Sequence, residues 1–157
     1  DEKGMNIASG DGTVNIASDG TVTGVDSEGK TFNMTSGAEG TATITNEDGT
    51  ANISLDGNAN MPDNFPKDVP MYTNMAIHLA RHNDADGAAN VAGTSKDSMD
   101  AIAKYYKDQA VAQGWTEESD MKQGGEMRFL TYSKDERQLS VILMSGGADT
   151  NIQVAVE

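Results

Sequence analysis

Six short segments with apolar residues at alternating positions fill the first 57 residues, and each is followed by a turn that contains glycine. The apolar sets are Met5 with Ile7, Val14 with Ile16, Val22 with Val25, Phe32 with Met34, Ala42 with Ile44, and Ala51 with Ile53 and Leu55. Alternation of this kind predicts strands, and an acidic residue followed by glycine suits the tight turns between them. The repeat therefore predicts an antiparallel β-meander over residues 1–60.

A β-solenoid with one strand per repeat is the alternative, because calcium-binding β-rolls also have short repeats. Neither the G-G-x-G-x-D signature nor the calcium loop D-x-[DN]-x-[DN]-G-x5-E occurs in the chain. We therefore expect structural turns, with cation binding by the acidic turns as the alternative. The predicted turns are Asp11-Gly12, Asp19-Gly20, Glu28-Gly29, Glu39-Gly40, Asp48-Gly49 and Asp56-Gly57.

The apolar face of this repeat offers only one or two modest side chains per strand. A single-layer sheet with so little to bury is marginally stable in water. We therefore expect the repeat to rest on the C-terminal module, on a second copy of itself or on a partner, and we predict either self-association through the N-terminal sheet or an extended arm.

Residues 61–75 contain all three prolines of the chain, at positions 62, 66 and 70. Proline fixes its own φ and biases the preceding residue away from helix. This segment, called the strap below, is predicted to stay extended, with Phe65, Val69 and Tyr72 anchoring it to the module that follows.

Seven of the eight aromatic residues lie in the strap or in residues 76–157, so the conventional core is expected after residue 60. A hairpin is predicted from strands at 76–81 and 88–92, followed by a helix that Ser95 or Asp97 caps and that ends at Gly114. The helix stripe is Met99, Ile102, Ala103, Tyr106 and Ala110, and later strands are expected near 116–119, 127–133, 139–144 and 152–156. The predicted fold class is α+β: an N-terminal antiparallel β-repeat, then a small antiparallel sheet covered by one helix.

The run Phe65-Pro66-Lys67-Asp68-Val69-Pro70-Met71-Tyr72, the helix pair Tyr105-Tyr106 and the dipeptide Gly114-Trp115 resemble a module of exported bacterial lipoproteins of unknown function. That module has an "FPxDVPxY" strap and a helix with "YY" that ends in "GW". The resemblance covers about 95 residues and implies no catalytic residues. Thr73-Asn74 departs from it, because the family often has a Pro-Gly-like turn there.

Charge and composition exclude several functions. A net charge of −14, without a basic stripe, disfavours nucleic acids and anionic membranes. The absence of cysteine removes disulfides and thiolate chemistry, and no apolar run is long enough to span a bilayer. With the resemblance, we expect an exported periplasmic or cell-surface protein from which either a signal peptide, or a signal peptide together with a lipidated cysteine that anchors the protein, has been removed before Asp1.

Candidate site residues are few. Tyr105, Trp115 and Tyr132 are the candidates for a ligand site between helix and sheet, and His82, Asp84 and Asp86 are the candidates for a metal site at a hairpin tip. His78 and His82 are expected on one face of a strand, too far apart to share a metal. The acidic cluster Glu117, Glu118 and Asp120 is expected to be a solvated turn.

No nucleotide-binding loop, nucleophile elbow or catalytic triad is present in the sequence. We therefore expect a non-enzymatic envelope protein without a cofactor, used for protein interaction or structure. The alternative is a small-ligand or cation-binding periplasmic module.

Overall fold

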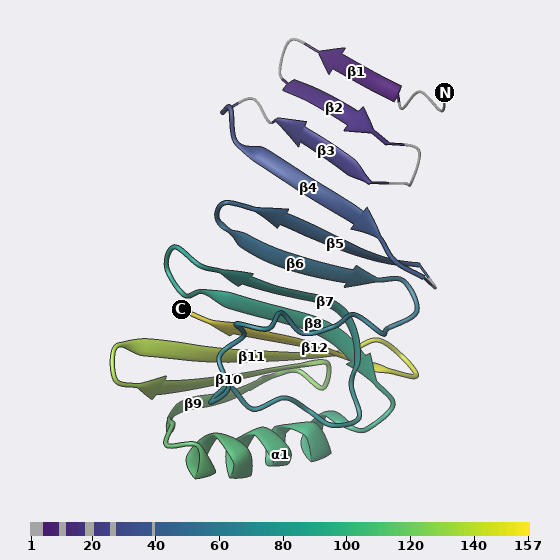
Figure 1. Cartoon of the computed structure of the whole chain (residues 1–157). Coiled ribbons are helices and arrows are strands. Elements are labelled where there is room, and N and C mark those ends of the chain that lie inside the picture. Colours follow the sequence, from purple (N-terminus) through teal and green to yellow (C-terminus); the bar gives the residue numbers. More distant parts are fainter. Residues whose placement is uncertain (1–4, 10–11, 18–20, 26–27, 39) are drawn as a thin grey trace.

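The chain forms one antiparallel sheet of twelve strands with a helix packed beside it (Figure 1). The computed structural model describes residues 5–9, 12–17, 21–25, 28–38 and 40–157. The strand order is β1-β2-β3-β4-β5-β6-β7-β8-β12-β11-β10-β9. The mixed α+β class is as predicted, but the small separate sheet is not observed, because β6 pairs with β7 and joins both parts of the chain into one sheet.

Six strands cover the apolar segments of the first 57 residues. They are β1 (Met5–Ser9), β2 (Gly12–Ile16), β3 (Val22–Val25), β4 (Thr31–Ser36), β5 (Thr41–Asn46) and β6 (Gly49–Ser54). Each pairs antiparallel with the next, so the solenoid alternative, which needs parallel neighbours, does not describe this chain.

Two details of the predicted apolar pattern are wrong. Val25 pairs with Thr13 and Thr31, whereas Val22 pairs with Met34, so the two valines of β3 face opposite sides of the sheet. Three residues separate them, and side chains alternate with a period of two in a strand. Leu55 follows the end of β6 and is 81% exposed.

The turn between β5 and β6 shows why glycine is required there. The turn residues are Glu47 and Asp48, and Gly49 opens β6 opposite Asn46 with a φ of 148°. A Cβ at position 49 would lie 2.0 Å from the carbonyl oxygen of His82 in β7. Among the predicted turns, residues 11, 19, 20 and 39 lie outside the described part of the chain.

The C-terminal part continues the sheet and supplies the helix. Its elements are β7 (Ala76–Asn83), β8 (Ala89–Ser95), α1 (Met99–Ala112), β9 (Thr116–Gln123), β10 (Met127–Lys134), β11 (Arg137–Ser145) and β12 (Thr150–Val156). The last strand, β12, lies between β8 and β11 and pairs antiparallel with both. The predicted hairpin of β7 and β8 is confirmed.

Helix α1 begins and ends at residues that satisfy its free backbone groups. The Ser98 side chain accepts a hydrogen bond from the backbone N–H of Ala101 at 3.3 Å, and Gly114 follows the last turn with a φ of 86°. The predicted caps Ser95 and Asp97 are wrong, because Ser95 is the buried last residue of β8 and the Asp97 carboxylate accepts from the Tyr72 hydroxyl at 2.7 Å. At 14 residues, and with a mixed surface, this helix is unable to cross a bilayer; no other helix lies in the described residues.

One face of the C-terminal strands carries the core. Helix α1 packs against β9, β10 and β11, and the strap runs across the same part of the molecule (Figure 1). The predicted anchors Phe65 and Val69 are buried in this core, and Tyr72 packs against it. Its largest fully buried side chains are Tyr106, Tyr132, Ile102, Leu130, Leu139, Leu143 and Ile152. The core therefore forms on the helix side of the sheet, and the opposite side is left without a covering layer among the described elements.

Candidate functional site

The side of the sheet that faces away from helix α1 is a continuous surface, which we call the open face. Strand register defines it, because directly paired residues share a face. One row of paired residues crosses from β2 to β9: Ile16, Val22, Met34, Ile44, Ala51, Arg81, Asn90, Ala155, Ser140, Thr131 and Ser119. The next row is Ala42, Ile53, Leu79, Ala92, Gln153, Ile142, Phe129 and Met121. The two rows make the open face one surface rather than two.

Large apolar side chains gather on the open face. Across β2 to β6 it presents Val14, Ile16, Val22, Phe32, Met34, Ile44 and Ile53, and across β7 to β11 it presents Leu79, Phe129, Met127, Ile142 and Met144, all of them half-buried. Met121 on the edge strand is 60% exposed. Neighbouring side chains on the same face shield these residues from the sides only. Their outer surfaces face solvent.

Charge is nearly absent from this surface. Among the described strand residues on the open face, the charged ones are Arg81 in β7 and Glu118 in the edge strand β9. The Glu118 carboxylate accepts a hydrogen bond from the Ser133 hydroxyl, so Arg81 is the one described cation near the middle of the face. Most carboxylates of the described residues therefore lie on turns, on the helix and on the helix side of the sheet.

Phe32 packs closely against the neighbouring strand in the N-terminal half of the sheet. Its ring lies over Gly24 on the neighbouring strand, where a Cβ would come within 2.3 Å of the ring carbon Cζ. Gly24 is buried beneath the ring although the strand around it has no second layer. The aromatic ring replaces the side chain that glycine lacks and extends the apolar surface over β3.

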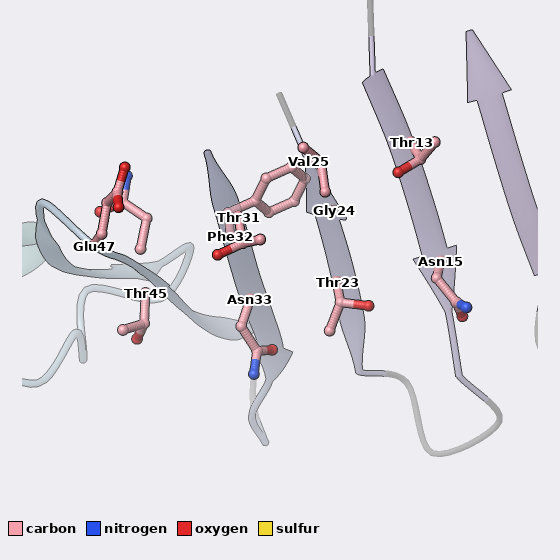
Figure 2. A pocket seen from close by; sticks show the side chains of 11 residues that line it. Thr13, Asn15, Thr23, Gly24, Val25, Thr31, Phe32, Asn33, Thr45 and Glu47 are labelled. Carbon is pink, nitrogen blue, oxygen red and sulfur yellow. The ribbon is translucent and has the colours of Figure 1, made fainter. Parts of the chain in front are cut away.

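The reverse side of the N-terminal strands is mostly polar, and the described strand residues on it carry no charge. Figure 2 shows threonine and asparagine side chains from β2, β3, β4 and β5 around a shallow hollow of about 590 Å³. Its lining is Thr13, Asn15, Thr23, Gly24, Val25, Thr31, Phe32, Asn33, Thr45, Asn46 and Glu47. The two faces of these strands thus differ sharply, one apolar and one made of hydroxyls and amides.

Two of the three aromatic candidates for a ligand site hold the strap, and the third lies in the core. The Tyr105 hydroxyl donates to the carbonyl of Met71 at 2.7 Å, and the Trp115 indole N–H donates to the carbonyl of Asp68 at 2.7 Å. Tyr132 is fully buried. The main hollows in the described part of the chain are lined by other residues.

Two aromatic hydroxyls of the core differ in their partners. The Tyr106 hydroxyl accepts a hydrogen bond from the backbone N–H of Tyr72 at 3.3 Å, whereas the Tyr132 hydroxyl has no partner among the described groups. Burial raises the pKa of both phenols, so each is neutral at all ordinary pH values. Neither residue is poised for acid–base chemistry.

The strap is also fixed by charge. The Asp68 carboxylate receives Lys134 at 2.8 Å and the guanidinium of Arg137, and both cations lie over the Trp115 ring, 5.8 Å and 5.1 Å from its centroid. The hydrogen bond from Arg137 is the main cause that lowers the pKa of Asp68 from 3.8 to about 2. Asp68 of the strap is thus joined to the β10–β11 hairpin through Lys134 and Arg137, and these two cations also contact Trp115.

The metal candidates lie near one another but serve the hairpin turn. His82 Nδ1 is 3.0 Å from Asp84 Oδ1, and the same oxygen accepts a hydrogen bond from the Asn64 side-chain amide. Asp86 Oδ1 accepts from the backbone N–H of Ala88 at 2.9 Å. Within the described residues no cluster of three His, Cys, Asp or Glu side chains has the geometry to hold a metal.

The two histidines do not share a face, contrary to the prediction. The register of β7 and β8 shifts between Ile77 and Leu79, which places His78 in a bulge. His78 contacts the Thr94 hydroxyl at 3.2 Å on the open face, whereas His82 pairs with Thr50 and Ala89 on the other side. A bulge adds one residue to a strand and so reverses the alternation, which a strictly alternating pattern does not reveal.

The acidic cluster after Trp115 is not a turn. Residues 117, 118 and 120 belong to strand β9, and Asp120 forms a two-pronged contact with Arg128 at 2.7 and 2.8 Å and a third with Lys107 at 2.7 Å. The hydrogen bond from Arg128 is the main cause of a strongly lowered pKa for Asp120. This carboxylate is ionised at all ordinary pH values and ties β9 to β10 and to helix α1. The prediction of a turn was wrong, because these residues pair with β10 as part of a strand, whereas Glu117 and Glu118 are exposed to solvent as expected.

Comparison with known proteins gives one match. A family model described as "START domain-like" matches residues 77–150, which is just under half of the chain and runs from β7 to the start of β12. Neither the curated proteins nor the solved structures contain a significant match to this chain. The similarity thus concerns the helix-bearing part of the sheet and does not extend over β1 to β6.

Sequence reasoning missed the open face as a single surface. The alternation of Phe129 with Thr131 and of Ile142 with Met144 is visible in the sequence. What was not visible is that β6 and β7 pair, and only this pairing aligns the apolar residues of both halves. A strand with apolar residues at both odd and even positions, as in β11, has two apolar faces, and this is the signal that the sequence offers.

Proposed function

We propose that this chain is a non-enzymatic interaction module of an exported, envelope-associated protein, and that the open face is its docking surface. The observation that carries the proposal is the wide surface on the side away from the helix, which carries few charges. It is apolar over β2 to β6 and over β10 and β11, with polar residues such as Asn90 and Gln153 where β8 and β12 cross it. Monomeric soluble proteins seldom expose continuous apolar patches larger than a few hundred Å². A surface of this kind is typical of a contact with another macromolecule.

Placement of charge supports the same function. The solvated face of an antiparallel sheet is usually polar or charged, and charges on exposed strands discourage pairing with other sheets. Here the carboxylates are abundant in the chain yet almost absent from this one face. Interface cores are likewise depleted of charged residues, so the distribution matches a surface that becomes covered.

Export and envelope attachment rest on the sequence. The strap, the tyrosine pair of the helix and Gly114-Trp115 resemble modules of exported bacterial lipoproteins, and the chain has no cysteine of its own. We propose a periplasmic or cell-surface location with attachment to the membrane through a lipid. A docking module held at a membrane by a short tether would present its face to neighbouring envelope proteins.

Ligand binding between helix and sheet is the competing function, and it has less support. The polar atoms of Tyr105 and Trp115 are bonded to strap carbonyls, and the space between helix and sheet is filled by buried side chains. The apolar surface, in contrast, requires an occupant.

The test is binding of Nile red, an uncharged apolar dye, at the lowest chain concentration that fluorescence allows. The wild-type chain should bind the dye saturably, and the double substitution Ile44→Lys with Ile142→Lys on the open face should weaken binding several-fold. Thr45→Lys, on the opposite side of the same strand as Ile44, is the matched control and should bind as the wild type does. Equal binding by all three proteins would show that the open face is not an available docking surface.

A further inference from the structure

We infer that the partner of the open face is a second copy of this chain, packed sheet on sheet. The inference rests on the proposed function and names the occupant of the same surface. Three properties of the sheet lead to it: its width, its thin N-terminal half and its distribution of charge.

Width restricts the choice of partner. Strands lie about 4.8 Å apart, so twelve of them span roughly 50 Å, and strands of five to eight residues are about 17–26 Å long. The open face thus offers on the order of 1,000 Å², compared with about 800 Å² per partner in a stable interface. A single helix covers only a strip of such a surface, whereas a second sheet of the same width covers all of it.

The N-terminal half of the sheet needs a second layer. Helix α1 contacts β9, β10 and β11, and the strap reaches the sheet at Asn52 of β6 and at Ile77 of β7. Strands β2 to β4 have no covering element on either side among the described contacts. Stable sheets usually consist of two packed layers, and two sheets pack well when their strands lie within about 30° of each other. A second copy supplies that layer over the whole width, which a partner seated only on the C-terminal half would not.

Charge is compatible with a contact between identical chains. Two copies with a net charge of −14 each repel at long range. Because the open face carries almost no carboxylates, a face-to-face contact keeps those charges on the outer surfaces. Association should therefore strengthen as salt rises, since salt screens the repulsion while the apolar contact remains. A partner held by opposite charge would show the reverse dependence.

The first measurement is the molar mass of the full chain by light scattering over a concentration series, at low salt and at about 1 M salt, where the Debye length falls to about 3 Å. We expect a monomer–dimer equilibrium whose dissociation constant decreases with salt. Ile44→Lys should raise that constant by about 100-fold or more, because it places an unpaired charge in the contact, while Thr45→Lys should leave it within a few-fold. A monomer at every concentration and salt, or a constant that Ile44→Lys leaves unchanged, would overturn the inference.

A second measurement does not depend on a charged variant staying folded. The chain has no cysteine, so Ala51→Cys on the open face and Thr45→Cys on the opposite side each introduce one thiol. The rate at which a maleimide modifies Ala51→Cys should fall about 10-fold or more as the mass rises to that of a dimer, and the rate for Thr45→Cys should stay constant. A dimer in which both thiols react at unchanged rates uses another surface, and the inference fails.

These results separate the inference from the function it rests on. A chain that binds Nile red on the open face but stays monomeric retains a docking surface with a different occupant, so only the inference is overturned. If the open face neither binds the dye in dilute solution nor becomes protected at high concentration, both the inference and the proposed function are overturned.

Discussion

The indole nitrogen of Trp115 donates a hydrogen bond of 2.7 Å to the backbone carbonyl of Asp68, 47 residues earlier in the chain. Trp115 follows the end of helix α1, and Asp68 lies in the strap, so this bond fixes the strap to the helix end. The Asp68 carboxylate at the same time binds Lys134 and Arg137. One residue of the strap is thus held through both its backbone and its side chain.

Trp115→Phe should destabilise the chain by about 1–3 kcal/mol, because the carbonyl of Asp68 loses its donor and the smaller phenyl ring fills less of the buried site. Urea unfolding followed by far-UV circular dichroism measures the change, and hydrogen exchange should show the strap opening before the sheet. Val111→Ala, which shortens an exposed side chain on the helix, is the control and should change the stability by less than about 0.5 kcal/mol. A Trp115→Phe variant as stable as that control would contradict the role of the bond.

Asp68→Asn should lower the free energy of unfolding at neutral pH by about 1–2 kcal/mol, a figure reduced for the partial exposure of the carboxylate. Because folding lowers the pKa of Asp68 from 3.8 to about 2, its contribution is complete above pH 3.8 and is lost as the pH falls towards 2. The difference between wild type and variant should therefore shrink over that interval. Comparing the two proteins at each pH separates this effect from that of Asp120, which is present in both. A difference that stays constant down to pH 2 would show that the ion pairs of Asp68 do not stabilise the strap.

Gly49→Ala and Gly87→Ala should differ in cost although both glycines have positive φ. At Gly49 a methyl group would lie 2.0 Å from the carbonyl oxygen of His82, whereas at Gly87 nothing lies within 4 Å. We expect about 1 kcal/mol for Gly87→Ala from backbone strain alone and about 3 kcal/mol or more for Gly49→Ala, because β6 and β7 must separate. Thermal unfolding of both variants measures this, and equal costs would contradict the close approach of β6 and β7.

Tyr132→Phe and Tyr106→Phe form a matched pair in the core. The Tyr132 hydroxyl is buried without a described partner, so its removal should leave stability unchanged or raise it by up to about 1 kcal/mol. The Tyr106 hydroxyl accepts from the backbone N–H of Tyr72, so its removal should cost about 1 kcal/mol. Denaturant unfolding of the two variants gives the order, and a larger loss for Tyr132→Phe would show that its hydroxyl has a partner.

Local sequence patterns predicted the positions of the helix and strands better than the contacts between them. The helix stripe of Ile102, Ala103, Tyr106 and Ala110 is buried as its spacing predicts, and strands lie over the apolar segments. The caps of the helix were misplaced because Ser95 is the last residue of β8, where its hydroxyl accepts from the backbone N–H of Asp97, and because the Asp97 carboxylate binds the distant Tyr72 hydroxyl. The residues predicted as ligand and metal candidates have structural partners instead. The polar atoms of Tyr105 and Trp115 bind the strap, and Asp86 accepts a hydrogen bond within its own turn.

The sequence by itself determined which residues form strands, where the prolines and glycines end them, and that the chain is acidic and lacks cysteine. These properties depend on neighbours along the chain, such as alternation, backbone restriction and the count of charges. Only the tertiary structure decided that β6 pairs with β7, that a bulge turns His78 to the open face and that Ile44 and Ile142 belong to one surface. Strand pairing and register arise from contacts between distant segments, and a shift of one residue exchanges the two faces of a strand. The open face therefore exists as a surface only once the twelve strands are in register.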